Sequence, residues 1–325
     1  MLSYQDAIDQ LSDGEIPSIL IANGFSQAWD ASIFNYASIL DAASFGTRDK
    51  EIKGLFKLSE TYDFETIMGQ LVSAQMVLET FDEDPALITQ IKDDQETLKS
   101  SLVSAIAKTH PSLPSEVTDH QFVAVRKFLS TFQNIFSLNY DLLLYWAINK
   151  FNLKPDNYRV DDGFRYPTVW NVTGTNQNLF FLHGGLHIFD EEVNIRKHAC
   201  TDEGLTIVDQ VRSNLNMHKF PLFVSEPTAE KKKIKIEHNP YLYKAFNKFG
   251  ELGGTLFIHG HSMDENDKHI FDQIVSSNVT KVYVSIFGDE NSAENKKSKA
   301  NALAYIQNLN ISVEFYQAES APIWA

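Results

Sequence analysis

The sequence contains a single cysteine, and this scarcity excludes whole classes of protein. Cys200 has no second cysteine to pair with, so the chain can form neither an internal disulfide nor a four-cysteine zinc site. A buried or inert thiol is the usual state of a lone cysteine. The fold must therefore depend on its hydrophobic core, for which 325 residues with 43% hydrophobic content provide enough material.

Positive charge and long apolar runs are also scarce. The formal net charge of -15 disfavours a surface that binds duplex nucleic acid. No run approaches the roughly 20 apolar residues of a membrane span, and the acidic segment 1–17 does not resemble a secretory signal. We expect a cytoplasmic protein without direct nucleic-acid or membrane contacts. The one basic run, Lys231 to Lys235, is expected on a solvated loop without a catalytic role.

The common phosphate-binding motifs are missing as well. The chain has neither the G-x-G-x-x-G of dinucleotide-binding loops nor the G-x-x-x-x-G-K-[ST] of P-loops. The segment Ala22-Asn23-Gly24-Phe25-Ser26 follows the first apolar run. It can form a tight turn with a Ser26 cap, or a loop whose backbone amides approach a phosphate. The local pattern leaves both interpretations open.

Short apolar runs alternate with connecting segments along most of the chain. This alternation predicts an α/β, Rossmann-like fold with a mostly parallel sheet and helices on both faces. Between the first two runs, residues 31–131 show the three- and four-residue spacing of helices, which predicts a large helical insertion. We expect one domain over residues 1–325. The expected strands cover residues 18–22, 134–138, 178–182, 221–225, 255–259, 281–287 and 311–316.

Local signals predict where some later helices begin. Asn239-Pro240 has the pattern of an N-cap followed by proline at the first helical position. Ser262-x-x-Glu265 has the pattern of a capping box. The long mixed segments 156–178 and 189–220 are expected to hold loops, lids or short helices.

Two polar residues follow the second expected strand. Asn139 and Asp141 are two positions apart, so an extended chain points both side chains to one face. The spacing also suits Asp141 as the cap of the following helix, and the local pattern favours that role. The amide of Asn139 offers two donors and one acceptor, which suit a sugar hydroxyl or an attacking water.

A histidine follows the third expected strand. His183 precedes Gly184 and Gly185, which leave the backbone open around the imidazole. Histidine titrates near neutral pH and can accept a proton from a hydroxyl, although a satisfied core histidine is the commoner outcome for such a residue. His187 lies about one helical turn further along, which raises the alternative of a metal site.

A second group of histidines keeps the metal alternative open. His259 and His261 are two apart on an expected strand and share a face, with Asp264, Asp267 and His269 close behind. Imidazole and carboxylate groups are normal ligands of hydrolytic metals. The capping-box pattern gives another explanation for the polarity of this segment. A metal-dependent hydrolase is therefore one candidate function.

Taken in order, these segments resemble the sirtuin-like superfamily of NAD-consuming enzymes, in its branch of bacterial single-domain proteins without an assigned function. Residues 22–26 are similar to the G-A-G-x-S loop that cradles the dinucleotide phosphates there, with alanine in place of the first glycine. Residues 137–141 are similar to the T-x-N-x-D segment. His183-Gly184 corresponds to the histidine-glycine pair, and residues 258–262 resemble the G-x-S loop that holds the adenosine ribose.

The resemblance implies cleavage of the bond between nicotinamide and ribose in NAD, with NAD as substrate and no metal. Asn139 would orient the water or a ribose hydroxyl, His183 would act as general base, and Asp141 would fix the ribose or assist the cationic transition state. The missing four-cysteine zinc module makes protein deacetylation an unsuitable activity. The residues expected to contact the nucleotide are Ala22, Asn23, Gly24, Phe25, Ser26, Gly184, Gly260 and Ser262.

The same resemblance implies a biological setting. Relatives of this kind are similar to anti-phage defence effectors that deplete NAD and are kept silent until triggered. A homo-oligomer or a regulatory protein partner would control such an activity, with the acidic surface and residues 31–131 as candidate control sites. A nucleotide-binding sensor or interaction module without catalysis is the third candidate function.

Overall fold

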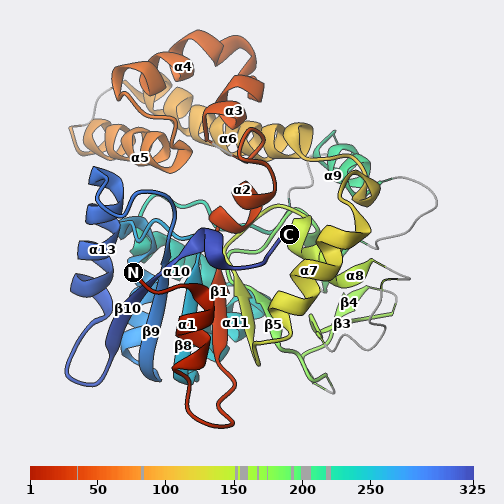
Figure 1. The fold of residues 1–325 in the computed structure, drawn as a ribbon. Coiled ribbons are helices and arrows are strands. Elements are labelled where there is room, and N and C mark those ends of the chain that lie inside the picture. The colour runs from red at the N-terminus through yellow and green to blue at the C-terminus, as the bar shows by residue number, and fades with distance from the viewer. Residues whose placement is uncertain are drawn as a thin grey trace.

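The computed structural model describes residues 1–34, 36–81, 84–150, 153, 160–166, 168–173, 175–191, 194–198, 206–216 and 221–325. A sheet of six strands, each parallel to its neighbours, forms its centre (Figure 1). These strands are β1 (Ser18–Ile21), β2 (Ile135–Ser137), β5 (Leu179–Phe181), β8 (Gly253–His259), β9 (Asn278–Ile286) and β10 (Ser312–Gln317).

The strand order of this sheet locates the place where a ligand can bind. The order is β10-β9-β8-β1-β2-β5. Counted along the chain, it is the 3-2-1-4-5-6 order of doubly wound dinucleotide-binding sheets. The direction of winding reverses between β1 and β8, and a crevice forms at such a switch point outside the carboxyl ends of the strands. The expected α/β fold with a mostly parallel sheet is confirmed, and its strand order is compatible with a Rossmann-like fold.

The central strand shows why these residues form a sheet. Ile19, Leu20 and Ile21 are completely buried, because helices cover both faces of a parallel sheet and each face needs apolar side chains. Figure 1 shows α1 (Tyr4–Asp9) and α7 (Asp119–Leu129) in front of the sheet and α10 (Ala229–Glu237) and α11 (Pro240–Gly250) behind it. The remaining helices of the sheet layers are α8 (Leu143–Asn149), α12 (Lys268–Val275) and α13 (Ala293–Ile306).

Helices fill the chain between β1 and β2. Figure 1 shows α3 to α6 as a layer above the sheet edge at which α2 begins. Pro111 comes directly after His110, the C-cap of α6, and Thr118 caps α7 by accepting a hydrogen bond from the Gln121 amide. The elements are α2 (Gly24–Asp30), α3 (Tyr36–Ala42), a 3-10 turn (Gly46–Arg48), α4 (Asp49–Leu58), α5 (Phe64–Thr80), α6 (Pro85–Thr109), a second 3-10 turn (Pro114–Glu116) and α7.

A second, smaller sheet lies in segments where the sequence predicts no strands. Its order is β3-β4-β7-β6, and its pairs are antiparallel. The expectation of loops, lids or short helices in segments 156–178 and 189–220 is therefore wrong for these strands, although a short helix, α9 (Ile207–Asn216), does form there. Strands of two or three residues are too short to show an alternating pattern. They are β3 (Phe164–Arg165), β4 (Val169–Trp170), β6 (Ile188–Asp190) and β7 (Ile195–Lys197).

Two further local predictions are wrong. Residues 221–225 form no strand and make only a single antiparallel bridge, between Gly184 and Phe223. Ser262 is not the start of a capping box, because the 3-10 turn Glu265–Asp267 begins after Asp264 and α12 follows it directly. Ser262 therefore lies in the loop between β8 and this 3-10 turn, at the edge of the sheet.

The helix start predicted at Asn239-Pro240 is confirmed. Asn239 caps α11 by accepting hydrogen bonds from the backbone amides of Tyr241 and Leu242, and Pro240 is the first helical residue, as expected. The basic run is not on a loop, since Lys231 to Lys235 lie in α10. Cys200 lies outside the described residues.

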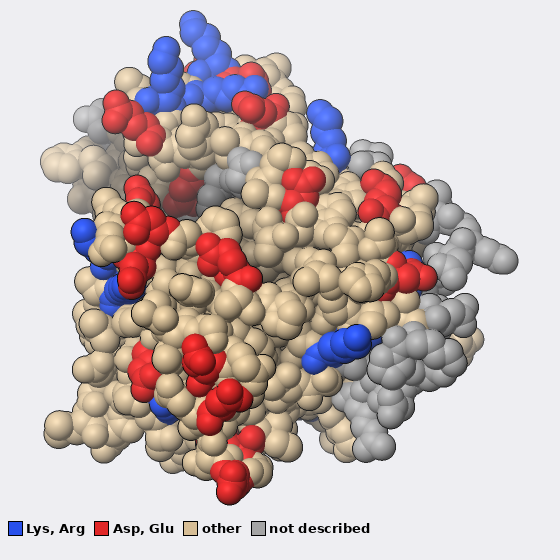
Figure 2. Space-filling view, viewed as in Figure 1, with Lys and Arg blue, Asp and Glu red and all other residues tan. Residues whose placement is uncertain are grey.

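Figure 2 shows acidic side chains in separate groups scattered over this face, with basic side chains gathered mainly over the upper helical layer. This distribution agrees with the net charge of -15. Among the helices in the described ranges, none is long and apolar enough to cross a membrane.

Candidate functional site

A cavity of about 780 Å³ lies at the carboxyl edge of the six-stranded sheet. Its walls include residues that follow five strands: Asn23 after β1, Asn139 after β2, His183 after β5, Gly260 after β8 and Phe287 after β9. Pockets of this size hold small ligands and cofactors. The cavity therefore occupies the position at which doubly wound sheets bind their ligands.

Two glycines bring the loops at the switch point into direct contact. The Gly24 amide donates a hydrogen bond to the Gly260 carbonyl at 2.9 Å. A Cβ on Gly24 would lie 2.5 Å from the Cα of Gly260, and a Cβ on Gly260 would lie 2.6 Å from the Cα of Gly24. Neither position has room for a side chain, so both glycines are required by packing of one backbone on the other.

The backbone amides of the loop after β1 already have acceptors within the chain. Phe25 donates to the carbonyl of Ala22 at 2.9 Å, and Ser26 donates to that of Asn23 at 3.0 Å. Gly24 is bonded to Gly260, as described above. These bonds form the tight turn of one interpretation, but the predicted Ser26 cap is wrong, because Ser26 lies inside α2 and its hydroxyl donates to Asp141. A phosphate contact by this loop remains a prediction.

A first buried network joins α2, the loop after β2 and the start of α8. Ser26 donates from its hydroxyl to Asp141 Oδ2 at 2.5 Å and accepts a hydrogen bond from Asn139 Nδ2 at 2.9 Å. The other oxygen of Asp141 accepts from the Leu143 amide at the start of α8, although the N-cap position of this helix is Leu142 and not Asp141 as predicted. Burial raises the pKa of Asp141 above its usual value, although these hydrogen bonds oppose the shift.

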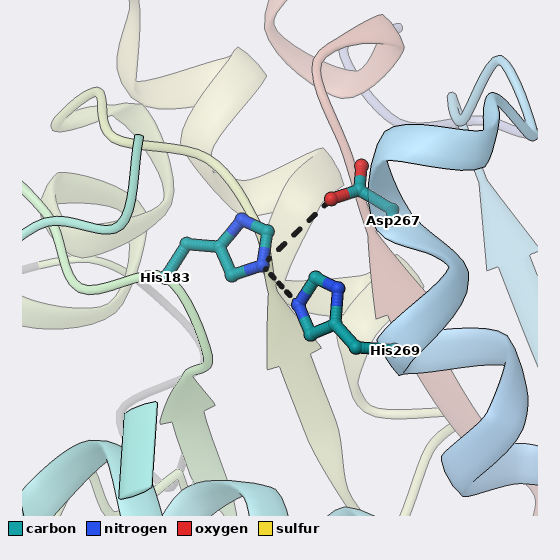
Figure 3. A group of neighbouring side chains, drawn as sticks. All are labelled: His183, Asp267 and His269. Atoms are coloured by element: carbon teal, nitrogen blue, oxygen red, sulfur yellow. Dashed lines mark hydrogen bonds and ion pairs between the residues drawn. The ribbon is translucent and has the colours of Figure 1, made fainter. Parts of the chain in front are cut away.

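His183 follows β5, the strand next to β2, and lines the same cavity. Its Nε2 is 3.1 Å from Nε2 of His269 and 3.9 Å from Oδ1 of Asp267 (Figure 3). Burial is the main cause that lowers the pKa of His183 well below 6.5, so the ring is neutral at pH 7. Gly184 turns the chain after His183 with φ of +74°, and a Cβ there would lie 2.0 Å from the Leu222 carbonyl oxygen. Packing therefore accounts for this glycine.

A second buried network contains full charges. Lys232 in α10 is 1% exposed, and its Nζ lies 2.9 Å from Oδ1 of Asp267. His261 Nε2 lies 3.1 Å from Oδ2 of the same carboxylate. Burial alone would raise the pKa of Asp267, but the Lys232 ammonium and the hydrogen bond with His261 bring it well below its usual value. Asp267 is thus a fixed negative charge beside the cavity.

The basic run predicts a solvated position for Lys232, but this residue lies in the cavity wall. The sequence contains one signal that indicates a buried position for Lys232. Lys232 and Ile236 are four residues apart, the spacing of one helix face, and both are buried in α10. The neighbouring lysines hide this pattern because the run looks uniformly basic.

Three side chains have the spacing of a metal site. The nearest donor atoms of His183, Asp267 and His269 lie within 4.8 Å of one another, close enough for one ion to reach all three (Figure 3). However, the Lys232 ammonium contacts the Asp267 oxygen nearest to His183 and would repel a cation there. Histidines that bind metals usually donate from their second nitrogen, whereas Nδ1 of His269 is buried without a partner among the described residues. These contacts favour an ion-pair network over a metal centre.

His187, the other histidine considered for metal binding, belongs to the core. It is completely buried, and its ring stacks on Tyr145 and packs edge-on against Phe181. Within the described part of the chain, neither ring nitrogen has a hydrogen-bond partner. Burial keeps its pKa well below 6.5, so the ring is neutral.

The structure brings most of the expected site residues to one cavity. Three of the expected residues do not line it, namely Phe25, Ser26 and Gly184. Ser26 is hydrogen-bonded to Asn139 and Asp141, which do line the cavity. Asp267, for which the sequence indicates only a candidate metal ligand, also lines the cavity. The expected residues in the wall are Ala22, Asn23, Gly24, Asn139, Asp141, His183, Gly260 and Ser262.

The strand order and the cavity together define a doubly wound α/β protein with a ligand cavity at its switch point. Residues 19–324 match the model of a family described as a domain of unknown function, DUF4917, and the chain belongs to this family. No curated protein matches the chain.

Proposed function

We propose that the protein is an NAD hydrolase that cleaves the bond between nicotinamide and ribose. The observation that carries this proposal is the position of Asn139 and His183, which follow adjacent parallel strands and line one cavity at the switch point of the sheet. The location suits a dinucleotide, and the two side chains suit attack by water on the ribose carbon.

The reaction converts NAD and water into nicotinamide, ADP-ribose and a proton. The bond from the ribose carbon to the nicotinamide nitrogen breaks with its electron pair on nitrogen, and a bond from water oxygen to the same carbon forms. His183 is neutral at pH 7 and can accept the proton that water loses. Asn139 Nδ2 is bonded to Ser26, so its amide oxygen can orient the water or a ribose hydroxyl.

Asp141 can serve the cationic transition state. Bond cleavage leaves positive charge on the ribose, as in other reactions at a glycosidic carbon. A carboxylate in the cavity wall stabilises that charge more in a buried site than in water. Its hydrogen bonds from Ser26 and Leu143 fix the position of its oxygens.

The biological role extends the same proposal. By its resemblance to NAD-depleting effectors, we place the protein in anti-phage defence in the cytoplasm. A homo-oligomer or a regulatory protein would then control the activity, and the helices between β1 and β2, regarded as an insertion, are the proposed control region. No metal is required.

The test is chromatography of purified protein incubated with NAD. Wild-type protein is expected to release nicotinamide and ADP-ribose in equal amounts. Loss of a general base or of an orienting amide typically costs about 10²-fold or more in rate, so His183→Ala and Asn139→Ala should be nearly inactive. His120→Ala is the matched control, because His120 is exposed on α7 away from the cavity wall.

Two outcomes would contradict the proposal. Retention of the wild-type rate by both cavity variants would show that the cavity is not the active site. Loss of wild-type activity on adding a chelator, with recovery on adding zinc or manganese, would instead support the metal-dependent hydrolase.

A further inference from the structure

The contacts of His261 indicate which of its ring nitrogens carries the proton. The Met263 amide donates a hydrogen bond to His261 Nδ1 at 2.8 Å, so this nitrogen carries a lone pair. The proton of the neutral ring is therefore on Nε2, which lies 3.1 Å from Oδ2 of Asp267. His261 thus donates to Asp267, and the carboxylate is held in place on that side.

The other oxygen of Asp267 is held by Lys232 and faces His183. With Lys232 on Oδ1 and His261 on Oδ2, both oxygens accept hydrogen bonds from fixed donors. Oδ1 is also the oxygen that lies 3.9 Å from His183 Nε2. The carboxylate stays ionised, and its charge acts directly on the side of His183 that faces His269.

The contact between His183 and His269 allows two arrangements. Their Nε2 atoms are 3.1 Å apart, so one of these nitrogens must carry a proton and the other must accept it. Burial of His269 Nδ1 without a partner is costly in both arrangements, because the atom is an unpaired donor in one and an unpaired acceptor in the other. The difference between them must come from another group.

We propose that Asp267 is a positioning residue that keeps the proton of His183 on Nε2 and thereby leaves Nδ1 as the atom that accepts a proton. The carboxylate oxygen is 3.9 Å from Nε2 of His183, and its negative charge favours a proton there. In Figure 3, Nδ1 lies on the edge of the ring that faces away from His269. The catalytic part of this inference rests on the proposed function, whereas the position of the proton does not.

The other charged and polar neighbours of His183 oppose Asp267 but have smaller effects. Lys232, His261 and His269 all disfavour added positive charge on His183, but Asp267 has the larger effect among these neighbours and acts in the opposite direction. The assigned arrangement keeps His183 neutral and changes only which nitrogen holds the proton. It therefore requires no titration.

Nuclear magnetic resonance of protein labelled with ¹⁵N-histidine tests the assignment directly. Protonated and bare ring nitrogens resonate far apart, and the His183 signals are identified by their loss in His183→Gln. In the wild type we expect a protonated Nε2 and a bare Nδ1. In Asp267→Asn we expect a mixture of the two tautomers or the reverse one.

Kinetics supply the second readout. A general base in the wrong tautomer loses most of its contribution, so kcat for NAD should fall by about 10²-fold in Asp267→Asn while KM stays near the wild-type value. Asp264→Asn is the matched control, because this nearby carboxylate pairs with Lys297 at the surface and should leave both readouts unchanged. If Asp267→Asn fails to fold because Lys232 is left unpaired, the double variant Lys232→Met/Asp267→Asn removes both charges and should show the same tautomer change.

Three results would overturn the inference. They are a proton on Nδ1 of His183 in the wild type, an unchanged tautomer in Asp267→Asn, and a wild-type spectrum that changes on adding a chelator. The spectra require no NAD. An inactive wild-type protein with the expected spectra would therefore refute the proposed function and still support the assigned proton.

Discussion

Asp141 and Asp267 line the same cavity, but their surroundings differ. Asp141 accepts hydrogen bonds from a hydroxyl and a backbone amide, and burial raises its pKa. Asp267 is paired with a buried ammonium and an imidazole, which bring its pKa well below the usual value despite burial. A buried carboxylate with neutral partners holds a proton more easily, and one with a cation remains charged.

This difference assigns distinct roles to the two carboxylates. Groups whose pKa values are moved in opposite directions in one site commonly divide the tasks of catalysis. Asp267 supplies a constant negative charge that orients its neighbours. Asp141, whose pKa is raised, is the carboxylate that takes up a proton more easily.

The largest effect is expected from Lys232→Met. This change leaves Asp267 without its cation, and breaking a buried ion pair in this way typically costs about 3 to 5 kcal/mol. Ser26→Ala, which removes a neutral donor from Asp141, should cost less, about 1 to 2 kcal/mol. Urea unfolding of each variant gives both free energies. Equal losses would show that the two networks do not differ in the way described.

A smaller loss of stability is expected where the loops that carry the two networks meet. Gly24→Ala places a Cβ 2.5 Å from a backbone atom of Gly260, and overpacking of this kind costs about 1 to 3 kcal/mol. The control is Gly54→Ala in α4, where a Cβ meets nothing within 4 Å and alanine favours the helix by about 1 kcal/mol. Calorimetry should show opposite shifts of Tm. A stable Gly24→Ala variant would show that the loops move apart freely.

A graded effect is expected from pH. The pKa of Asp141 is raised in the folded state, so its contribution to stability is fully present below pH 3.8 and is lost as pH rises through the folded pKa. The pKa of Asp267 is lowered, so its contribution is present above pH 3.8 and is lost only as pH falls below that value. Between pH 4.5 and 7, the free energy of unfolding of the wild type relative to Asp141→Asn should decrease, while that relative to Asp267→Asn should stay constant. If both differences in the free energy of unfolding changed with pH in the same way, the pKa values of the two carboxylates would not be shifted in opposite directions.

Much of the sheet and one side of the cavity could be predicted from the sequence. The run from Ile19 to Ile21 has no polar position, because a central parallel strand is buried on both faces. Asn139 and His183 each follow such a strand, and in a parallel sheet the carboxyl ends of the strands meet at one edge. Their common cavity follows from that geometry.

The other side of the cavity could not be predicted in the same way. Lys232 lies on α10, and its partner Asp267 lies 35 residues later, just before α12. Their pairing depends on how two helices pack, which no local spacing reveals. The short strands β3 and β4 were missed for a related reason, since two residues in each are extended only through pairing with distant segments.

Trp324 gives the cavity an optical property. Its indole lines the wall, donates a hydrogen bond to the Phe25 carbonyl at 2.7 Å and packs against the Phe25 ring. Indole emission responds to the polarity and the quenching groups around the ring. The protein therefore carries its own fluorophore in the wall of its ligand cavity, and entry of a molecule into this space can be followed by light without any label.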